Sequence, residues 1–191
     1  ALPGVSAMSA IAVLHVVWSA VGMWLFAGAV GLSSFGRGIS ALAYALSGYL
    51  IGRAGSFPTA DAAAWIPWIF WLVERVLSER RARDAGWLGG ALGMQLLAGH
   101  AQTAWYGGLM VGAYAVWVAV RRQRGNPVAL RVRGLALAGS GAVLGALIAA
   151  IQVVPTLEYF TQSSRSEGLS FEVTANLSYP PLQLLTLLNP N

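Results

Sequence analysis

Long apolar segments separated by short polar breaks dominate the pattern along this chain. The clearest is an uncharged run from Ala85 to Val120, which arginine clusters flank on both sides and which a polar stretch interrupts near its middle. At about 1.5 Å of rise per residue, the run is long enough for two helical crossings of a bilayer. We therefore expect a helical hairpin whose turn lies at the polar stretch, around Gly99, His100 and Gln102.

The same pattern predicts four further apolar spans, which make an all-α, polytopic transmembrane helix bundle of about six spans. These four are Val5–Val30, Gly38–Gly52, a segment that begins beside Asp61 and ends at Glu74 and Arg75, and Gly134–Val154. Polar and turn-forming residues separate the spans. The expected connections are a turn at Ser33–Arg37, a loop at Ala54–Ala60 and a polar loop at Gln162–Ser178.

Charge gives the predicted spans a direction. The basic residues are all arginines, and most of them fall in two clusters, residues 75–83 and residues 121–133. Short arginine-rich loops stay on the cytoplasmic side of a membrane. The hairpin turn then faces the opposite side, and counting spans backwards places the N-terminus of this segment outside the cytoplasm.

Composition agrees with a membrane protein and excludes several other classes. The chain is 57% hydrophobic and 10% charged, whereas a soluble domain carries about 25% charged residues. The net charge of +5 is concentrated in two loops, which is not the pattern of a nucleic-acid partner surface. The absence of cysteine excludes disulfides and thiolate metal sites, and two histidines cannot supply a rich metal site. We expect one transmembrane helical domain over residues 1–191, as a fragment of a longer chain or as a processed small subunit.

Four pairs of glycines are spaced four residues apart, a pattern that lets helices approach closely in lipid. They are Gly48 and Gly52, Gly89 and Gly93, Gly108 and Gly112, and Gly141 and Gly145. We expect these pairs to lie where helices pack on one another.

The candidate binding residues share the outer face once the spans are assigned. A polar group at the mouth of a helix bundle could hold a lipid that carries a phosphate and a sugar, because arginine binds phosphate by bidentate hydrogen bonds. The alternative is structural, with a turn histidine that caps a helix and with arginines that extend to water. The candidates are Arg53, His100, Gln102, Glu158 and Arg165.

His15 stands apart from these candidates, near the middle of the first span. Its imidazole could ligate a tetrapyrrole such as haem or chlorophyll. A histidine that bonds to a neighbouring helix is the simpler interpretation.

Four blocks of sequence, at residues 43–50, 64–68, 95–102 and 152–158, the last followed by Ser164 and Arg165, resemble in order and spacing the bacterial YfhO-type membrane proteins. That family is regarded as glycosyltransferases of the GT-C superfamily. The most specific parts are Gly-His-Ala-Gln at residues 99–102 and Gln-Val-Val-Pro-Thr-Leu-Glu at residues 152–158.

The resemblance implies a GT-C-like fold in the bacterial inner (cytoplasmic) membrane and an enzyme that uses a lipid-linked, polyprenyl-phosphate sugar donor. In that mechanism Arg53 or Arg165, with His100, would hold the donor phosphate, while the acidic catalytic residue would lie outside this chain. The alternative function is a non-catalytic structural or accessory subunit of a larger respiratory or photosynthetic complex. In that case the partners would be other membrane subunits, and His15 or His100 would contact a haem or chlorophyll.

Overall fold

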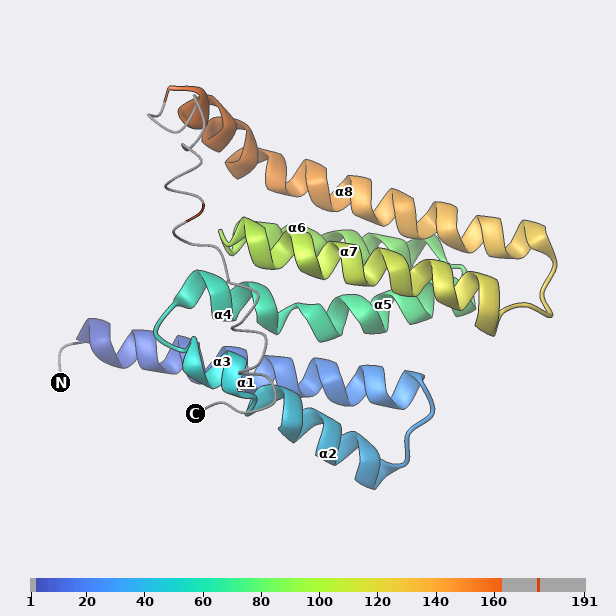
Figure 1. The fold of residues 1–191 in the computed structure, drawn as a ribbon, viewed down its shortest axis with the longest axis horizontal. Helices are drawn as coiled ribbons and strands as arrows, with labels where there is room; N and C mark the ends of the chain where they lie inside the picture. The colour runs from blue at the N-terminus through green and yellow to red at the C-terminus, as the bar shows by residue number, and fades with distance from the viewer. Residues whose placement is uncertain (1–2, 163–174, 176–191) are drawn as a thin grey trace. The chain divides into compact units, whose positions relative to one another are not determined.

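The structure is a computed structural model of the 191-residue chain, and it describes residues 3–162 and residue 175. The chain divides into two compact units, Ala1–Ile151 and Gln152–Asn191. Every regular element in the described part is a helix, so the predicted all-α class is confirmed (Figure 1).

The described helices follow one another with short connections. They are α1 (Pro3–Ala29), α2 (Ser34–Ala45), α3 (Gly48–Gly52), α4 (Phe57–Ala64), α5 (Ile66–Glu79), α6 (Ala82–Leu97), α7 (Ala101–Trp117), the π-helical turn η1 (Val118–Arg122) and α8 (Val128–Thr161).

Three of these segments are long and apolar enough to cross a membrane, which indicates a membrane protein. They are Ser6–Ala29, Ala101–Arg122 and Val128–Thr161.

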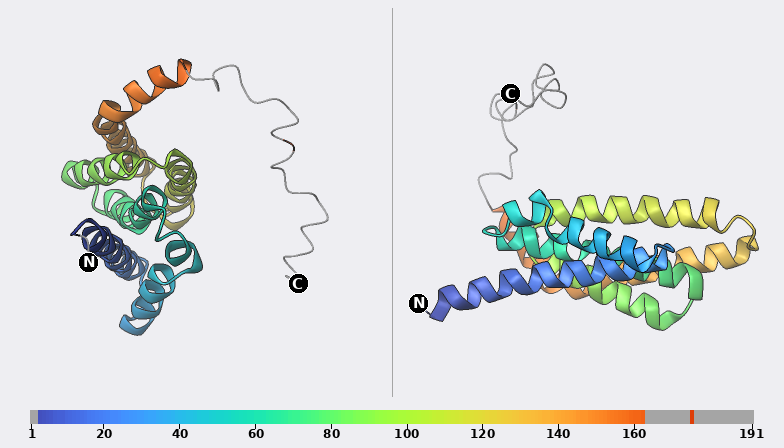
Figure 2. Two further views of the ribbon diagram at one scale, coloured as in Figure 1. Left: turned by 90° about the vertical axis from the view of Figure 1, so that its left-hand side faces the viewer. Right: turned by 90° about the horizontal axis from the view of Figure 1, so that it is seen from below.

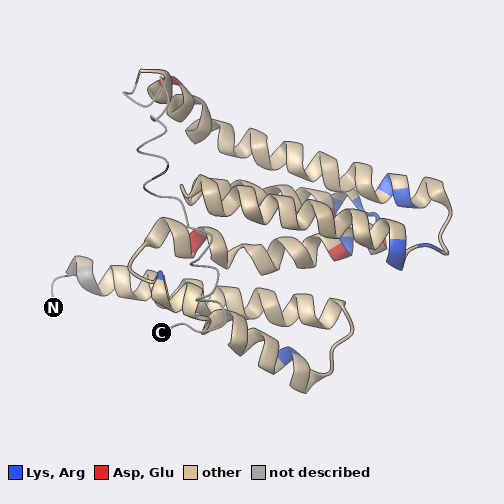
Figure 3. Ribbon diagram, in the orientation of Figure 1, with Lys and Arg blue, Asp and Glu red and all other residues tan. Residues whose placement is uncertain are grey.

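The hairpin predicted for the uncharged run is present. Helix α6 ends at Leu97 and α7 begins at Ala101, so the reversal falls on the polar stretch. Gly99 has a φ of +84°, a left-handed conformation that glycine adopts without strain. The arginines gather at the opposite end of the hairpin, beside the connections from α5 to α6 and from η1 to α8 (Figure 3).

The second predicted span, Gly38–Gly52, is two helices and not one. Helix α2 starts earlier, at Ser34, with the Ser33 hydroxyl accepting a hydrogen bond from the Gly36 amide at 3.3 Å. The chain then breaks between α2 and α3, where the Ser47 hydroxyl caps α3 by accepting from the Leu50 amide at 3.4 Å. A serine at this position offers a side-chain acceptor for a new helix start, which competes with continuing the old helix.

The predicted loop Ala54–Ala60 is wrong in its second half, because α4 already begins at Phe57. Pro58 lies in the first turn of α4, where a missing amide hydrogen costs nothing. Trp65 then connects α4 to α5, and Pro67 occupies the first turn of α5 in the same way. The third predicted span is therefore also built from two helices.

The last helix is longer at both ends than the predicted span Gly134–Val154. Helix α8 includes Arg131 and Arg133 at its start and continues through Pro155. Arginine is a good helix former, so a charged residue need not end a helix. Proline is tolerated inside helices of membrane proteins. Beyond Gln162, the predicted polar loop lies outside the described residues except for Ala175.

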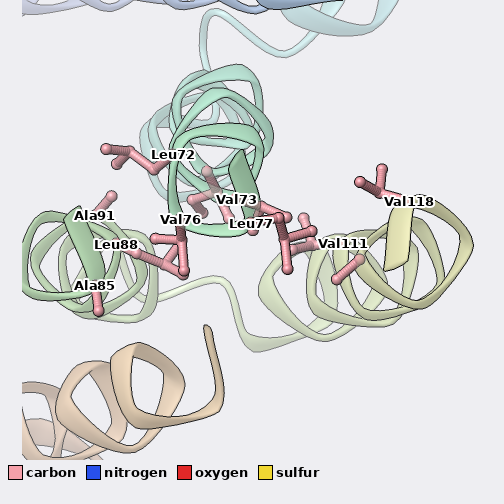
Figure 4. Packing of buried hydrophobic residues seen from close by; sticks show 11 residues of the cluster. Leu72, Val73, Val76, Leu77, Ala85, Leu88, Ala91, Val111 and Val118 are labelled. Atoms are coloured by element: carbon pink, nitrogen blue, oxygen red, sulfur yellow. The ribbon is translucent and has the colours of Figure 1, made fainter. Parts of the chain in front are cut away.

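Helix α5 forms the centre of the first unit. It contacts α1, α6 and α7, and in the end-on view of Figure 2 it lies between α1 and the green helices α6 and α7. Its side chains Val73, Val76 and Leu77 are almost fully buried, and Leu88 of α6 and Val111 of α7 pack against this cluster (Figure 4). This core thus fixes α5 against the α6–α7 hairpin.

The glycine pairs divide into two groups. A Cβ added at Gly89 would lie 2.8 Å from the Leu144 side chain, and one at Gly145 would lie 3.0 Å from the Gly89 carbonyl oxygen. The pairs on α6 and α8 therefore face each other, as expected for close helix packing. At the pairs Gly48 and Gly52, and Gly108 and Gly112, no described residue lies within 4 Å of such a Cβ, so the predicted role of these pairs in packing is wrong for the described helices.

Candidate functional site

A polar cavity of about 260 Å³ lies where the α6–α7 turn meets the end of α3 and the start of α4. Three of the five predicted binding residues, Arg53, His100 and Gln102, line this cavity. The other lining residues are Tyr49, Thr59, Thr103 and Tyr106. The fold brings these side chains together because the α3–α4 connection and the hairpin turn are at the same end of their helices.

His100 is the N-cap of α7. Its Nδ1 accepts a hydrogen bond from the Thr103 amide at 3.1 Å and lies 2.7 Å from the Thr103 hydroxyl. An amide N–H can only donate, so Nδ1 carries no proton, and in the neutral ring the proton is on Nε2. The interpretation of His100 as a helix cap is therefore correct. The capping hydrogen bond uses only Nδ1, so the Nε2–H group can still donate to a ligand.

A short hydrogen-bond chain holds the His100 ring in place. The Tyr49 hydroxyl lies 3.1 Å from the Thr103 hydroxyl, which itself contacts His100. When Thr103 donates to His100, its oxygen is free to accept from Tyr49. Thr103 is buried, so α3 and α7 are joined through this chain beneath the cavity.

Arg53 gives the cavity a positive charge. It follows the last residue of α3, is exposed, and makes no ion pair with any carboxylate among the described residues. Gln102 is also exposed, and its amide donates to the Tyr106 hydroxyl at 3.5 Å. An unpaired guanidinium beside an imidazole N–H and an amide suits a phosphate or another oxyanion.

A larger apolar groove of about 680 Å³ adjoins the polar cavity. The two share the lining residues Tyr49, Thr103 and Tyr106. The rest of the groove is formed mainly by apolar side chains of α1, α2, α5 and α7, such as Met23, Ala43, Ile66 and Met110. A polar cavity that continues into an apolar groove has the chemistry of a site for an amphipathic molecule.

Two predicted members of the site are not placed in this cavity. Glu158 is exposed on α8 and belongs to the second unit, and Arg165 lies outside the described residues. Their predicted contribution stays a prediction.

His15 has an ionisable neighbour that the linear sequence does not reveal. Its Nδ1 lies 3.0 Å from the Ile11 carbonyl oxygen and 3.3 Å from Asp61 Oδ1 on α4. The Ile11 carbonyl oxygen can only accept, so it places a proton on Nδ1, and only Nε2 could bind a metal. The 3.3 Å charge contact with Asp61 links α1 to α4, so His15 interacts with a neighbouring helix.

A second polar cluster, at the arginine end, was missed by the sequence reasoning. Glu74 of α5 is buried, and its Oε1 accepts hydrogen bonds from the Tyr114 hydroxyl and, at 2.5 Å, from Arg122. The π-helical turn η1 ends at Arg122, and such turns often occur at functional positions. The available signal was a carboxylate within the apolar run of α5, which is costly unless it is paired.

Comparisons with known proteins add no family to this picture. The described residues hold no group of three or more histidine, aspartate or glutamate side chains that could bind a metal ion.

A scan of protein-family models, a search of curated proteins and a search of solved structures each found no match to this chain.

Proposed function

We propose that the protein binds a polyprenyl-phosphate-linked sugar and takes part in the transfer of that sugar to an acceptor outside the cytoplasm. The observation that carries the proposal is the continuity between the polar cavity at Arg53 and His100 and the apolar groove beside it. A lipid-linked sugar also joins a polar part to an apolar part, because it has a charged phosphate and hydroxyl groups at one end and a long apolar chain at the other.

Each part of the site has a role in holding this donor. Arg53 binds the phosphate, and the Nε2–H of His100 donates a hydrogen bond to the same group as negative charge develops on the leaving phosphate. Gln102 bonds to sugar hydroxyls through its amide. The prenyl chain lies along the groove between α2 and α7, against Met23 and Met110.

The proposal includes six crossings of the membrane. The crossings are α1, α2 with α3, α4 with α5, α6, α7 with η1, and α8. Arginines at one end of these helices then face the cytoplasm, and the cavity at the other end opens toward the outer leaflet. A GT-C-like arrangement is part of the same proposal, through the resemblance to YfhO-type proteins.

The group that deprotonates the acceptor is not assigned to any residue of this chain. Asp61 lies on α4 close to the cavity residue Thr59, but its carboxylate faces His15. The resemblance places the catalytic carboxylate in a loop outside these residues. The residues of the polar cavity supply donor binding and orientation.

A binding experiment tests the donor site with polyprenyl phosphate as the probe. The change Arg53→Gln should weaken binding to the detergent-solubilised protein about tenfold or more, because a charge-assisted contact to phosphate is lost. Arg124→Gln is the matched control, since Arg124 is exposed and lies in the η1–α8 connection. Equal affinities of the Arg53→Gln variant and the unchanged protein would contradict the proposal.

A transfer experiment tests the reaction itself. His100→Ala in the full-length protein should abolish sugar transfer in membranes while expression and insertion stay intact. Retained transfer with lost polyprenyl-phosphate binding would separate the binding site from the reaction. The accessory-subunit alternative has no specific observation among the described residues in its favour.

A further inference from the structure

A second polar cavity, of about 270 Å³, lies at the arginine end of the helices, where α5, η1 and the connection from η1 to α8 meet. Its lining residues are polar or charged except for Val118, and they are Glu74, Ser78, Arg80, Arg122, Gln123 and Asn126. Ser78, Arg122 and Asn126 are exposed to solvent, so a ligand can reach the cavity. None of its lining residues belongs to the polar cavity at His100.

The π-helical turn η1 contributes neighbouring residues to this cavity. The Gln123 amide donates to the Val118 carbonyl oxygen, five residues earlier, at 2.9 Å. A turn of this width brings two successive residues, Arg122 and Gln123, to the same face as Val118, and all three line the cavity. The wider turn thus helps to assemble the polar wall.

Arg80 carries a positive charge that no carboxylate compensates among the described residues. Its Nε donates to the Leu130 carbonyl oxygen at 3.0 Å, its Nη1 to the Ser78 carbonyl oxygen at 3.4 Å, and its Nη2 to Gln123 Oε1 at 3.3 Å. Each terminal nitrogen bears two hydrogens, so one N–H on Nη1 and one on Nη2 have no acceptor in the part of the chain that the structure describes. Two N–H groups on one guanidinium can bind a phosphate in a bidentate way.

The backbone at Arg80 does not explain why an arginine stands there. Arg80 ends α5 in the left-handed region, with a φ of +53°. Glycine adopts this conformation at a helix end without steric cost, whereas a residue with a Cβ does not. The arginine is therefore explained by its side chain, which three hydrogen bonds hold at the cavity wall.

The carboxylate in the cavity does not cancel the charge of Arg80. Glu74 accepts hydrogen bonds from Tyr114 and Arg122, so Glu74 and Arg122 compensate each other and one positive charge is left over. Other arginines at this end also form no ion pair with any described carboxylate, namely Arg83, Arg121, Arg124, Arg131 and Arg133. The charge of this end therefore favours an anion in the cavity.

Apolar side chains beside the cavity indicate which kind of anion fits. The cavity lies at the ends of two segments that are long and apolar enough to cross a membrane, Ala101–Arg122 and Val128–Thr161. Close to the lining residues in the chain are exposed apolar side chains: Trp117, Val120, Val128 and Leu130. A phospholipid can use both the cavity and these side chains, whereas a free phosphate can use the cavity alone. Basic pockets between membrane helices are known to bind anionic lipid headgroups.

We propose that this cavity binds the headgroup phosphate of an anionic phospholipid, phosphatidylglycerol, in the leaflet at the arginine end. The two free N–H groups of Arg80 hold the phosphate, and the Asn126 amide donates to an oxygen of the headgroup. A zwitterionic headgroup adds an ammonium, which the surrounding arginines repel. The inference rests on the membrane setting of the chain and not on the proposed sugar transfer, whose cavity has different lining residues.

Lipid retention measured by native mass spectrometry tests this inference. The full-length protein is extracted from nanodiscs that contain phosphatidylglycerol, phosphatidylethanolamine and phosphatidylcholine in equal amounts. We expect phosphatidylglycerol to be retained at least about tenfold over each of the other two lipids, because it alone brings a net negative charge to the arginines. Equal retention of phosphatidylglycerol with either of the other lipids would overturn the inference.

Two variants test the cavity itself. Arg80→Gly should lower phosphatidylglycerol retention about tenfold, because the phosphate contact is lost while the backbone conformation is kept. Asn126→Asp should lower it as well, because it places a negative charge at an exposed position of the cavity wall. Unchanged retention in Asn126→Asp would overturn the inference even if Arg80→Gly were unstable.

The matched control is Arg124→Gln, which lowers the net charge by one, as both variants do. Arg124 is exposed and does not line the cavity, so its replacement should leave phosphatidylglycerol retention unchanged. Arg53→Gln, which alters the proposed donor site, should also leave it unchanged. A loss in either control as large as in Arg80→Gly would place the lipid outside this cavity and overturn the inference.

Thermal unfolding in lipid-free detergent distinguishes a lipid from a free phosphate. Added phosphatidylglycerol should raise the unfolding temperature of the unchanged protein and should not raise that of Asn126→Asp. Inorganic phosphate at the same concentration should have no effect, because it lacks the acyl chains. An equal rise with inorganic phosphate would show a site for free phosphate and overturn the assignment to a lipid.

Discussion

At the scale of single residues, His100 serves two purposes with its two ring nitrogens. Nδ1 caps α7 by accepting from the Thr103 amide, and Nε2 remains for a ligand in the cavity. A capping residue such as asparagine would satisfy the helix end equally well. The structural role therefore explains why the chain is polar here, and the imidazole supplies a further donor that the cap does not use.

The two roles of His100 can be separated by substitution. His100→Ala should lower the free energy of unfolding by about 1 kcal/mol, because the cap of α7 is lost. His100→Asn should restore most of that stability. Both variants should bind polyprenyl phosphate more weakly, because both lose the Nε2 donor. The two measurements are thermal unfolding in detergent and the affinity for polyprenyl phosphate. If His100→Asn bound polyprenyl phosphate as tightly as the unchanged protein, His100 would not be part of the binding site.

Glu74 makes a second residue-scale prediction. Its carboxylate is buried and accepts from Tyr114 and Arg122, while Arg122 is 41% exposed to solvent. Breaking a buried pair costs several kcal/mol, but screening at the exposed arginine reduces this. Glu74→Gln should lower the free energy of unfolding by about 1 to 3 kcal/mol.

The control for Glu74 is Glu79→Gln on the same helix. Glu79 pairs with Arg75 and Arg81 near the surface, so its loss should cost under about 1 kcal/mol. Chemical or thermal unfolding of both variants measures the difference. If both variants lost the same free energy of unfolding, the hydrogen bonds of Glu74 would stabilise the protein no more than a surface ion pair does.

At the scale of helices, close packing depends on which glycines face a backbone. A Cβ at Gly145 would lie 2.7 Å from the Leu92 Cβ and 3.2 Å from the Gly93 amide nitrogen. Backbone atoms cannot rotate away as a flexible side chain can, so α6 and α8 would have to separate. At Gly139, also on α8, no residue of the described part lies within 4 Å of the position that a Cβ would take.

Gly145→Ala should therefore destabilise the protein by about 1 to 3 kcal/mol, the usual cost of overpacking. Gly139→Ala should be neutral or slightly stabilising, because alanine favours helices. Comparing the unfolding temperatures of the two variants in one detergent measures the effect. Equal unfolding temperatures would mean that the α6–α8 contact contributes little to stability.

At the scale of the whole molecule, the distribution of charge predicts sidedness. The arginine-rich connections lie at one end of the helices, and the hairpin turn lies at the other end (Figure 3). Arg53 lines the same cavity as the hairpin-turn residues His100 and Gln102. By the positive-inside rule we expect the arginine end to face the cytoplasm, and this orientation is part of the proposed function.

Cysteine labelling tests this assignment, because the chain has no cysteine of its own. Cysteines at Ser56 and Ala101 should react with a membrane-impermeant thiol reagent added from outside, and cysteines at Ala82 and Asn126 should not. Permeabilised cells, in which all four should react, provide the control. The reverse labelling pattern would place the cavity on the cytoplasmic side and contradict the proposed donor site.

The sequence by itself determined the all-helical class and the place of the hairpin turn. Both follow from local causes, namely the length of the apolar runs and the polar stretch around Gly99 and His100. Arg53, His100 and Gln102 could be expected to share one face, because the order of spans alone fixes which ends meet.

Only the tertiary structure determined where the apolar segments break into separate helices and which residues pair with the charged side chains on those helices. The breaks at Ser47 and Trp65 depend on capping and packing as well as on hydropathy, so apolar segments that look continuous become paired helices. Glu74 and Asp61 find their partners, Arg122 and His15, far away in the chain. A charge on an apolar helix is stable only through such distant partners, and only the folded arrangement identifies them.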